Sequence, residues 1–345
     1  MITNLQFENF RGFNALKLEG LKRVNLVVGR NNAGKTSLLE GIGAVTNPER
    51  FVDMPRLLRS TTGDYNLRYF RWLIRDKENI RAASLEASGP GTECKIRLTR
   101  FQNQEMVPAP GGWQEVSSLP FPTGGGMALF APTDRTIAAD HVRKLMDRTG
   151  HSRAAAIQTR VAVRVMSVHP HPPEVLVKLF AQAVRKKGGE ERIEKLMQQV
   201  DDRVIKLRVE PAEDGNHIVV DLGLSEMLPL SQVGQGLYRL VAIFSELIGG
   251  QPGICIIDEL ENGIHHSLLE QVWTGLAVVA EELNIQFFVS THSYECIQAA
   301  HEAFLKRPEY DFSIVQLFRV EGAVQGRVLE RVQIEAALSG GIDLR

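Results

Sequence analysis

A glycine-rich loop near residue 30 carries the residue types that could do phosphate chemistry. The sequence GxxxxGK[ST] runs from Gly29 to Thr36, directly after the apolar stretch Val24–Val28 and before a helix-like stretch. Gly29 and Gly34 let successive backbone N–H groups converge on an anion, and the positive end of the following helix points at the same place. Lys35 adds a mobile positive charge for the phosphates, and the Thr36 hydroxyl can ligate Mg²⁺. A strand before and a helix after complete the P-loop context, so we expect a bound nucleoside triphosphate.

Two adjacent acids follow a second apolar stretch much later in the chain. Ile254–Ile257 has the pattern of a buried strand, and Asp258 and Glu259 come directly after it. In a mostly parallel sheet this strand ends at the same edge as the P-loop strand, where ligands bind in such folds. A strand-terminal acid holds Mg²⁺ in P-loop enzymes, which assigns Asp258, and the next acid, Glu259, can orient the attacking water. Two solvated acids at a strand end are the alternative.

A third polar group ends the buried-strand pattern Ile285–Ser290. Thr291 and His292 follow it, and His292 could hydrogen-bond the γ-phosphate. A core histidine satisfied by backbone is the alternative for such a residue taken alone. Direct metal ligation by histidine is not expected, since paired zinc spacing is missing from the set Glu261, His265, His266 and His292.

Composition bounds the class of protein. The 345 residues suit two packed units or one domain with a large insertion, and a hydrophobic content of 43% suits a globular core. A net charge of -1 means that any nucleic-acid contact must be local. Cys94, Cys255 and Cys296 are scattered, which favours a reducing compartment. No apolar run reaches the ~18 residues of a membrane span, and no signal-peptide layout is present, so we expect a cytoplasmic protein that contacts no membrane.

Periodicity and turn residues predict the elements that position these groups. Expected single strands are Ile2–Phe7, Leu16–Leu18 and Met127–Phe130. Expected antiparallel pairs are Ala82–Leu85 with Cys94–Phe101, Val204–Val209 with His217–Leu222, and Phe312–Phe318 with Arg327–Val332. Expected helices are Ile137–Met146, Ala154–Val168, Pro173–Val184, Glu190–Val200, Leu237–Ile248 and Ser267–Leu283. The Gly- and Pro-rich segment Val107–Gly126 is expected to be a surface loop.

Five motifs in order give the chain a family resemblance. They are Asn9-Phe-Arg-Gly-Phe13, the P-loop, Leu230-Ser-Gln-Val-Gly-Gln-Gly236, Ile256-Ile-Asp-Glu259 and Ser290-Thr-His-Ser293. This order resembles the ABC-type ATPases of the SMC/RecF group, and most closely the overcoming-lysogenization-defect (OLD) type. The stretches 258–266 and 291–296 look like those of short stand-alone bacterial members, which occur in antiphage defence operons. The resemblance lies in residues 1–50 and 226–295, and the middle region matches only in length and position.

The resemblance implies a fold and a set of site residues. It implies an α/β ABC-type P-loop ATPase head with a mixed sheet flanked by helices, whose core is 1–50 and 226–345. A large insertion or lid at 51–225 is expected to be mainly helical and in part β-strand. Asp258 and Glu259 match Walker B, and His292 matches the switch histidine. Arg11 matches an arginine that reaches the nucleotide, with a local salt bridge as the alternative. The Walker A loop matches Gly29, Asn31, Asn32, Ala33, Gly34, Lys35, Thr36 and Ser37.

The signature motif implies a second subunit. Ser231 and Gly234 match the motif that caps the γ-phosphate of the opposite subunit, although Gln232 and Val233 depart from the usual LSGGQ form. A serine at a helix N-terminus has no phosphate of its own if its P-loop lies across the sheet. Two facing subunits would complete each other's sites with C₂ symmetry, and hydrolysis would weaken the interface. The D-loop departs from the family pattern, and Gln102 and Gln104 are weak Q-loop candidates.

The leading hypothesis is a cytoplasmic Mg²⁺-dependent ATPase that dimerises on ATP and engages DNA or an effector protein through residues 51–225. The sequence does not specify whether the dimers build larger oligomers. DNA contact would use basic faces, which as an alternative are merely solvated. These faces carry Arg143, Lys144, Arg148, Arg153, Arg160, Arg164 and Arg185–Lys187.

Other functions are weighed against this hypothesis. A regulator or scaffold would sequester a toxin or nuclease and release it according to nucleotide state. A nuclease is disfavoured because the tail after His292, about 50 residues, is too short for a TOPRIM domain. The altered signature and the insertion disfavour a transporter motor. A GTPase is disfavoured because no Asn-Lys-x-Asp motif occurs.

Overall fold

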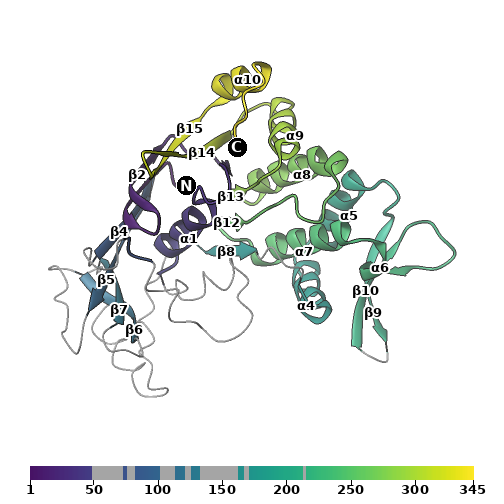
Figure 1. Ribbon diagram of the computed structural model, residues 1–345. Coiled ribbons are helices and arrows are strands. Elements are labelled where there is room, and N and C mark those ends of the chain that lie inside the picture. Colours follow the sequence, from purple (N-terminus) through teal and green to yellow (C-terminus); the bar gives the residue numbers. More distant parts are fainter. Residues whose placement is uncertain are drawn as a thin grey trace.

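The computed structural model describes residues 1–48, 73–75, 82–101, 113–120, 126–132, 162–166, 171–212 and 215–345. These residues form two six-stranded sheets and one three-stranded sheet, with helices packed against them (Figure 1). The expected helix Ile137–Met146 and the candidates Gln102 and Gln104 lie outside the described residues.

The central sheet is mostly parallel and has the strand order β15-β14-β3-β13-β12-β8. Only β15 runs antiparallel, against β14. The P-loop strand β3 therefore lies next to β13, and β13 lies next to β12, so the ends that carry the three polar groups are neighbours at one edge. The strands are β3 (Val24–Val28), β8 (Val163–Met166), β12 (Ile254–Ile257), β13 (Gln286–Ser290), β14 (Phe312–Val320) and β15 (Ala323–Leu329).

Two expectations for this sheet are wrong in part. The helix expected over Ala154–Val168 is wrong at Val163–Met166, where β8 pairs with β12. Val163 and Met166 are buried by that pairing, and β-branched residues in a buried strand outweigh a helical pattern. The strand expected to reach Val332 ends at Leu329, because Glu330 caps helix α10 (Arg331–Ser339) with its own side chain.

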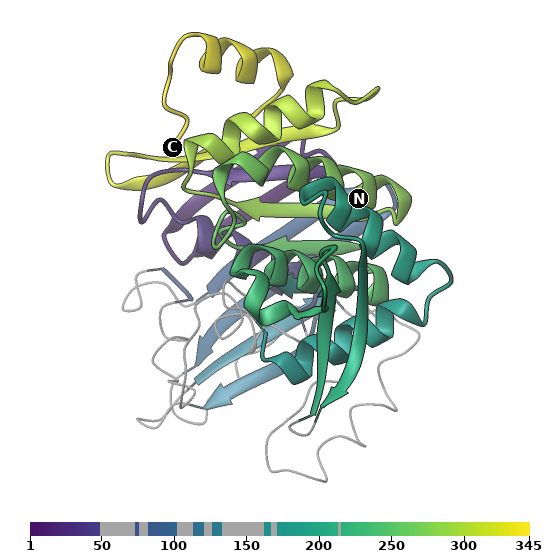
Figure 2. The ribbon, with the colours of Figure 1, turned by 90° about the vertical axis from the view of Figure 1, so that its right-hand side faces the viewer.

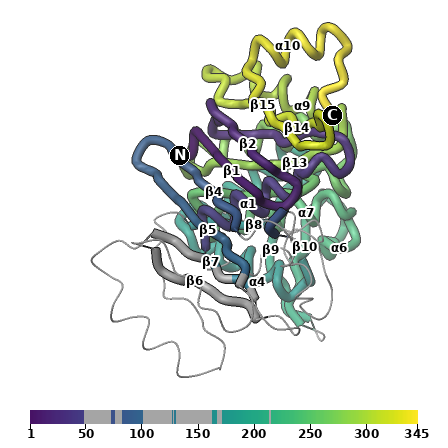
Figure 3. The backbone as a smooth tube through the Cα atoms, turned by 60° about the vertical axis from the view of Figure 1, so that its left-hand side comes forward, coloured from purple at the N-terminus to yellow at the C-terminus, as the bar shows by residue number. Residues whose placement is uncertain are grey.

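The second sheet is antiparallel and has the order β2-β1-β4-β5-β7-β6 (Figure 3). The expected pairing of β4 with β5 is confirmed. The loop expected over Val107–Gly126 is wrong at Trp113–Pro120, where β6 pairs with β7 across a register shift, so the Gly and Pro residues only flank a strand. The strands are β1 (Asn4–Phe10), β2 (Phe13–Glu19), β4 (Ala82–Gly89), β5 (Thr92–Phe101), β6 (Trp113–Pro120) and β7 (Gly126–Pro132).

Helix α1 (Lys35–Thr46) lies between the two sheets, as predicted for the helix after the P-loop. Its residues Leu38 and Ile42 share one core cluster with Phe7 of β1 and Val27 of β3. The alternate strand residues, such as Leu26, point to a second core on the other face of the parallel sheet. Thus α1 is buried on both sides, which fixes the loop that precedes it.

The remaining helices cover the far face of the parallel sheet, apart from α10 (Figure 2). The expected helices Pro173–Val184, Glu190–Val200, Leu237–Ile248 and Ser267–Leu283 are confirmed with small shifts of their ends. The elements are α4 (Pro173–Val184), α5 (Gly189–Val200), α6 (Leu230–Val233), α7 (Gln235–Gly250), a 3₁₀ turn (His266–Leu268), α8 (Leu269–Glu282) and α9 (Tyr294–Leu305).

The third sheet is a small one beside α4 and α6. The expected hairpin is confirmed as β9 (Lys206–Ala212) with β10 (Gly215–Asp221), and β11 (Leu228–Pro229) adds a short third strand. The described part of 51–225 thus holds seven strands, β4 to β10, and two helices, α4 and α5. One of these strands, β8, belongs to the central sheet.

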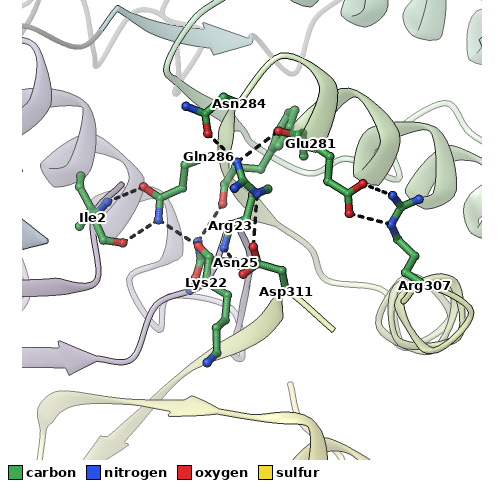
Figure 4. A network of polar contacts seen from close by, with 11 residues as sticks. Ile2, Lys22, Arg23, Asn25, Glu281, Asn284, Gln286, Arg307 and Asp311 are labelled. Atoms are coloured by element: carbon green, nitrogen blue, oxygen red, sulfur yellow. Dashed lines mark hydrogen bonds and ion pairs between the residues drawn. The ribbon is translucent and has the colours of Figure 1, made fainter. Parts of the chain in front are cut away.

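Hydrogen bonds at the amino edge of the parallel sheet join the two ends of the chain (Figure 4). The buried Gln286 amide donates to the carbonyls of Ile2 at 2.7 Å and Lys22 at 2.9 Å, and accepts from Ile2 N at 2.8 Å. Arg23 N donates to Asp311 Oδ1 at 2.9 Å. The Asn25 amide donates to the Lys22 and Phe287 carbonyls. Strands from residues 2–28 and 286–320 are therefore locked in one register.

Within the part of the chain that the structure describes, no helix combines the length and apolarity needed to cross a bilayer.

Candidate functional site

The P-loop follows β3 as a tight, strained turn. Gly29 and Gly34 have φ angles of 149° and 102°, which favour glycine, and Asn32 adopts a left-handed φ of 62°. A Cβ at Gly29 would lie 2.6 Å from the Leu317 carbonyl oxygen, so a side chain does not fit there. Asn31 and Asn32 are exposed, whereas Ala33 is buried. The loop is therefore exposed to solvent from Arg30 to Asn32.

Lys35 is folded over this loop. It is 5% exposed, and its ammonium group donates to the carbonyls of Gly29 at 2.6 Å and Arg30 at 3.3 Å. Burial lowers the pKa of Lys35, and the nearby carboxylates oppose that shift. The Nζ atom also lies 3.2 Å from His292 Nδ1. The lysine thus joins the P-loop to the residue that follows β13.

Asp258 and Thr36 place hard oxygen ligands together. Asp258 is 5% exposed, its Oδ2 accepts from Thr36 Oγ1 at 3.3 Å, and its Oδ1 accepts from Ser290 Oγ. Burial raises the pKa of Asp258, and the two hydroxyl donors oppose the shift. A hydroxyl and a carboxylate fit Mg²⁺, which keeps most of its waters and takes few protein ligands. Among the described residues, no cluster of three or more Asp, Glu, His or Cys suggests another metal site.

Glu259 is held in a fixed orientation. Its backbone has a left-handed φ of 49°, and its N–H donates to Ser290 Oγ at 2.9 Å. One carboxylate oxygen accepts from Asn262 Nδ2 at 2.6 Å, and the other lies 3.5 Å from His292 Nε2. The Glu259 and His292 side chains are 35% and 39% exposed. His292 thus bridges Lys35 and Glu259 at the surface of the site and is not a core histidine.

Three further residues support this arrangement and were not assigned roles from the sequence. Glu261 Oε1 accepts from His292 N at 2.7 Å, and Asn262 orients Glu259. Arg239 of α7, 9% exposed, donates to the carbonyls of Glu259 at 2.9 Å, Asn262 at 3.0 Å and Asp258 at 3.3 Å. Only the position of Glu261 and Asn262 just after the acids was a usable signal. Nothing in the local pattern around Arg239 indicates its distant carbonyl partners.

A cleft of about 680 Å³ opens beside these groups. Its walls come from the first P-loop residues, from the loop after β12, from His292 and from a segment that follows α10. The lining residues are Gly29, Arg30, Asn31, Glu259, Glu261, Asn262, His292, Asp343 and Arg345.

Other predicted residues lie elsewhere. Ser231 is exposed on α6, and Gly234 follows it with a φ of 132° at the start of α7; neither lines the cleft. The Arg11 Nε atom lies 3.0 Å from Glu40 Oε2 of α1, and both side chains are largely buried. The local ion pair, the alternative for Arg11, is thus present, and nucleotide contact by Arg11 stays a prediction.

Two parts of the basic faces predicted from the sequence lie among the residues that the structure describes. Arg164 lies on β8, and its Nε is 3.0 Å from Glu246 Oε1. Arg185–Lys187 follow α4 and are exposed. The other basic residues lie outside the described residues.

Two family models match the chain. One is described as "AAA domain" and matches residues 4–105. The other is described as "AAA domain, putative AbiEii toxin, Type IV TA system" and matches residues 129–297. A curated protein of Helicobacter pylori, "ATP/GTP phosphatase", is 24% identical over 332 residues, which covers 86% of this chain and 87% of that protein.

Solved structures of SMC heads share the fold. The SmcHead bound to the C-winged helix domain of ScpA has a TM-score of 0.57 at 12% identity and covers 98% of this chain and 99% of that chain. An Smc head domain with an extended coiled coil, bound to the C-terminal domain of ScpA derived from Pyrococcus furiosus, has a TM-score of 0.54 at 11% identity and covers 98% of each chain. The expected α/β fold with a mixed sheet flanked by helices is thereby confirmed.

Proposed function

We propose that this chain, a P-loop ATPase with the fold of an SMC head, hydrolyses ATP with Mg²⁺ in a site that a second copy completes. One observation carries the proposal. Lys35, Asp258, Glu259 and His292 meet at the cleft edge, whereas Ser231 lies on another part of the same chain.

Binding would rest on the loop and on two oxygen ligands. The P-loop amides and the positive end of α1 would hold the phosphates, and Lys35 would leave the Gly29 and Arg30 carbonyls for them. Thr36 and Asp258 would hold Mg²⁺, which when bound would neutralise charge on the triphosphate. Burial disfavours both the Lys35 ammonium and the Asp258 carboxylate. A bound phosphate would stabilise the charged form of Lys35, and Mg²⁺ would stabilise that of Asp258.

Hydrolysis would rest on the pair Glu259 and His292. Asn262 donates to the Glu259 carboxylate, and Ser290 Oγ accepts from the Glu259 backbone N–H. The carboxylate so held would accept a proton from the attacking water or orient it. His292, already within reach of Lys35, would hydrogen-bond the terminal phosphate. Glu259 and His292 each lie two residues beyond the end of a buried strand of the parallel sheet.

The dimer would bring Ser231 and Gly234 of one protomer over the triphosphate of its partner. Gly234 has open space where a Cβ would lie, and the exposed N-terminal end of α7 begins directly after it. A helix N-terminus with an adjacent serine hydroxyl suits an anion. The buried Arg239 fork ties α7 to the loop that carries Glu259 of the same chain, so contact of one protomer's signature motif with the partner's triphosphate would also reach the first protomer's own Glu259.

The output is proposed to be the engagement of DNA or an effector protein in the cytoplasm, in antiphage defence or another DNA-related process. Larger assemblies than the dimer fit the same scheme. Two similar SMC heads are bound to domains of ScpA, which supports a protein partner for this chain. One matching family model describes a component of a toxin–antitoxin system. This supports the second candidate, a scaffold that sequesters and releases a toxin. Exposed Arg185–Lys187 are the described residues that could meet DNA.

Two variants test the proposal together. Lys35→Ala should weaken ATP binding roughly 10- to 100-fold, as expected for lost charge-assisted hydrogen bonds. Glu259→Gln should bind ATP as the wild type does, accumulate as a dimer in light scattering, and lose about 100-fold or more in turnover. Lys306→Ala, at an exposed lysine paired with Glu270, is the matched control. Wild-type turnover by Glu259→Gln would show that another group orients the water.

A further inference from the structure

A short segment after α10 returns to the nucleotide cleft. Gly341 has a left-handed φ of 65°, and Ile342 N donates to the Ala337 carbonyl at 2.9 Å, so the chain reverses at the end of the helix. Leu344 is then 1% exposed in the core, and its carbonyl accepts from the buried Gln316 Nε2 at 2.9 Å. The segment is therefore anchored and its side chains have fixed positions.

This anchor places Asp343 and Arg345 on the wall of the cleft. Arg345 Nε donates to Asp343 Oδ1 at 2.9 Å, and its Nη2 donates to Oδ2 at 3.3 Å. The guanidinium carbon also lies 5.9 Å from the centre of the Tyr294 ring, two residues beyond His292. Both charged side chains remain about half exposed. The arginine is thus presented to the cleft in a defined orientation, with a carboxylate as its present acceptor.

The cleft is at the terminal-phosphate end of the site. The P-loop residues that line it are the first ones, Gly29 to Asn31, and the opposite wall carries Glu259 and His292. Three acids line this end, Glu259, Glu261 and Asp343, against two arginines, Arg30 and Arg345, while Lys35 is buried on the P-loop carbonyls and does not line the cleft. A triphosphate that enters here needs a further positive charge near its outermost oxygens. The planar guanidinium fork matches a phosphate as it matches a carboxylate.

We propose that Arg345 is a terminal-phosphate ligand of this site, and that Asp343 holds its guanidinium in the free protein and competes with the nucleotide for it. The exchange is one acceptor for another: the two N–H groups now on Asp343 would turn to the γ-phosphate oxygens. This proposal rests on the ATP site proposed above. It adds a ligand from a segment to which no motif assigned a role, and it predicts opposite effects for two neighbouring residues.

The test compares tri- and diphosphate affinities by calorimetry, using Mg²⁺ with AMP-PNP or with ADP. All proteins carry Ser231→Arg, which is designed to block the dimer, so each affinity belongs to a single protomer. Arg345→Gln should weaken AMP-PNP binding about 10-fold and ADP binding less than about 2-fold, since only the terminal phosphate is lost. Asp343→Asn should tighten AMP-PNP binding by about 2- to 5-fold, because it removes a competing, repelling charge.

Arg331→Gln is the matched control. Arg331 also pairs with a nearby carboxylate, Glu335, and lies over a tyrosine ring, but it does not line the cleft. It should bind both nucleotides as the parent does. Equal losses for AMP-PNP and ADP, or no loss, in Arg345→Gln would overturn the proposal. If the Ser231→Arg parent binds neither nucleotide, or if adding Lys35→Ala leaves both affinities unchanged, the ATP site itself is wrong. That result differs from a failure of the Arg345 proposal alone, in which the parent binds both nucleotides and Lys35→Ala weakens them.

Discussion

Thr36 Oγ1 lies 3.3 Å from Asp258 Oδ2, although 222 positions separate the two residues in the chain. The short distance follows from the strand order β3-β13-β12, which places the ends of the P-loop strand and the acid-bearing strand one strand apart. The amino edge of the same strands is locked by Gln286. The site is therefore a product of the sheet topology.

A complementation assay tests the composite site. Lys35→Ala removes one protomer's phosphate lysine, and Ser231→Ala removes the signature hydroxyl without adding bulk at the dimer interface. Each variant alone should be inactive. A mixture should recover roughly a quarter of wild-type ATPase activity, because half of the random dimers are mixed and each mixed dimer has one intact site. An inactive mixture in which mixed dimers are shown to form would contradict the shared site.

Arg239 should act as a positioning residue for Glu259. Its guanidinium serves three carbonyls, and two lie on the acids themselves. Arg239→Lys keeps the charge but loses the fork, so kcat should fall about 10-fold while the ATP dissociation constant changes less than about 2-fold. Arg239→Ala should also lower stability by about 2–4 kcal/mol, since buried carbonyls lose their donors. Equal kcat in the wild type and Arg239→Lys would assign the residue a purely structural role.

Gln286 should stabilise the fold without taking part in chemistry. Gln286→Leu keeps the volume but leaves the Ile2 and Lys22 backbone groups without their amide partner. We expect a loss of about 2–4 kcal/mol in the free energy of unfolding, measured by urea titration. Gln325→Leu, at an exposed position of β15, is the control and should change stability by less than about 0.5 kcal/mol. A loss no larger than that of the control would show that the network is dispensable.

His301 should make stability depend on pH. Burial lowers the pKa of its imidazole, and burial raises the pKa of the Tyr310 hydroxyl, which lies 2.7 Å from His301 Nδ1. Below the ordinary histidine pKa, His301 is therefore protonated in the unfolded chain and not yet protonated in the native chain. The free energy of unfolding should fall as the pH drops from about 7 to about 5. His301→Asn should reduce the slope of the free energy of unfolding against pH in this range, whereas His217→Gln on β10 should leave the slope as in the wild type. Equal slopes in all three proteins would refute the assignment.

The sequence predicted the parts of the site whose chemistry is local. Lys35 and Thr36 could be predicted from the P-loop pattern between a strand and a helix. Asp258 and Glu259 could be predicted because they follow a buried strand directly, and the strand ends share an edge. Arg239 could not be found, because its partners are backbone carbonyls about 20 positions away and any carbonyl looks the same in sequence. Arg345 was missed for a similar reason: only the buried Leu344 brings it back to the cleft.

The errors in the fold have the same origin. Val163–Met166 was expected to be helical from its local pattern. Its burial comes from pairing with β12, some 90 positions later, which the local pattern does not indicate. Trp113–Pro120 was expected to be a loop, because the Gly and Pro residues beside it hide a strand whose partner is β7. Local pattern predicts local hydrogen bonds well. It says little about a short strand that exists only through a distant neighbour.

The most direct test of the shared magnesium site is a double-mutant cycle on the Mg²⁺-dependent gain in ATP affinity. The gain is the ratio of ATP dissociation constants in EDTA and in Mg²⁺, measured for the wild type, Thr36→Val, Asp258→Asn and the double variant. If both oxygens hold one ion, either single variant should lose most of the gain, and the double variant should lose little more. A gain that persists in Asp258→Asn, or losses that simply add, would contradict the claim that these two distant residues serve one ion.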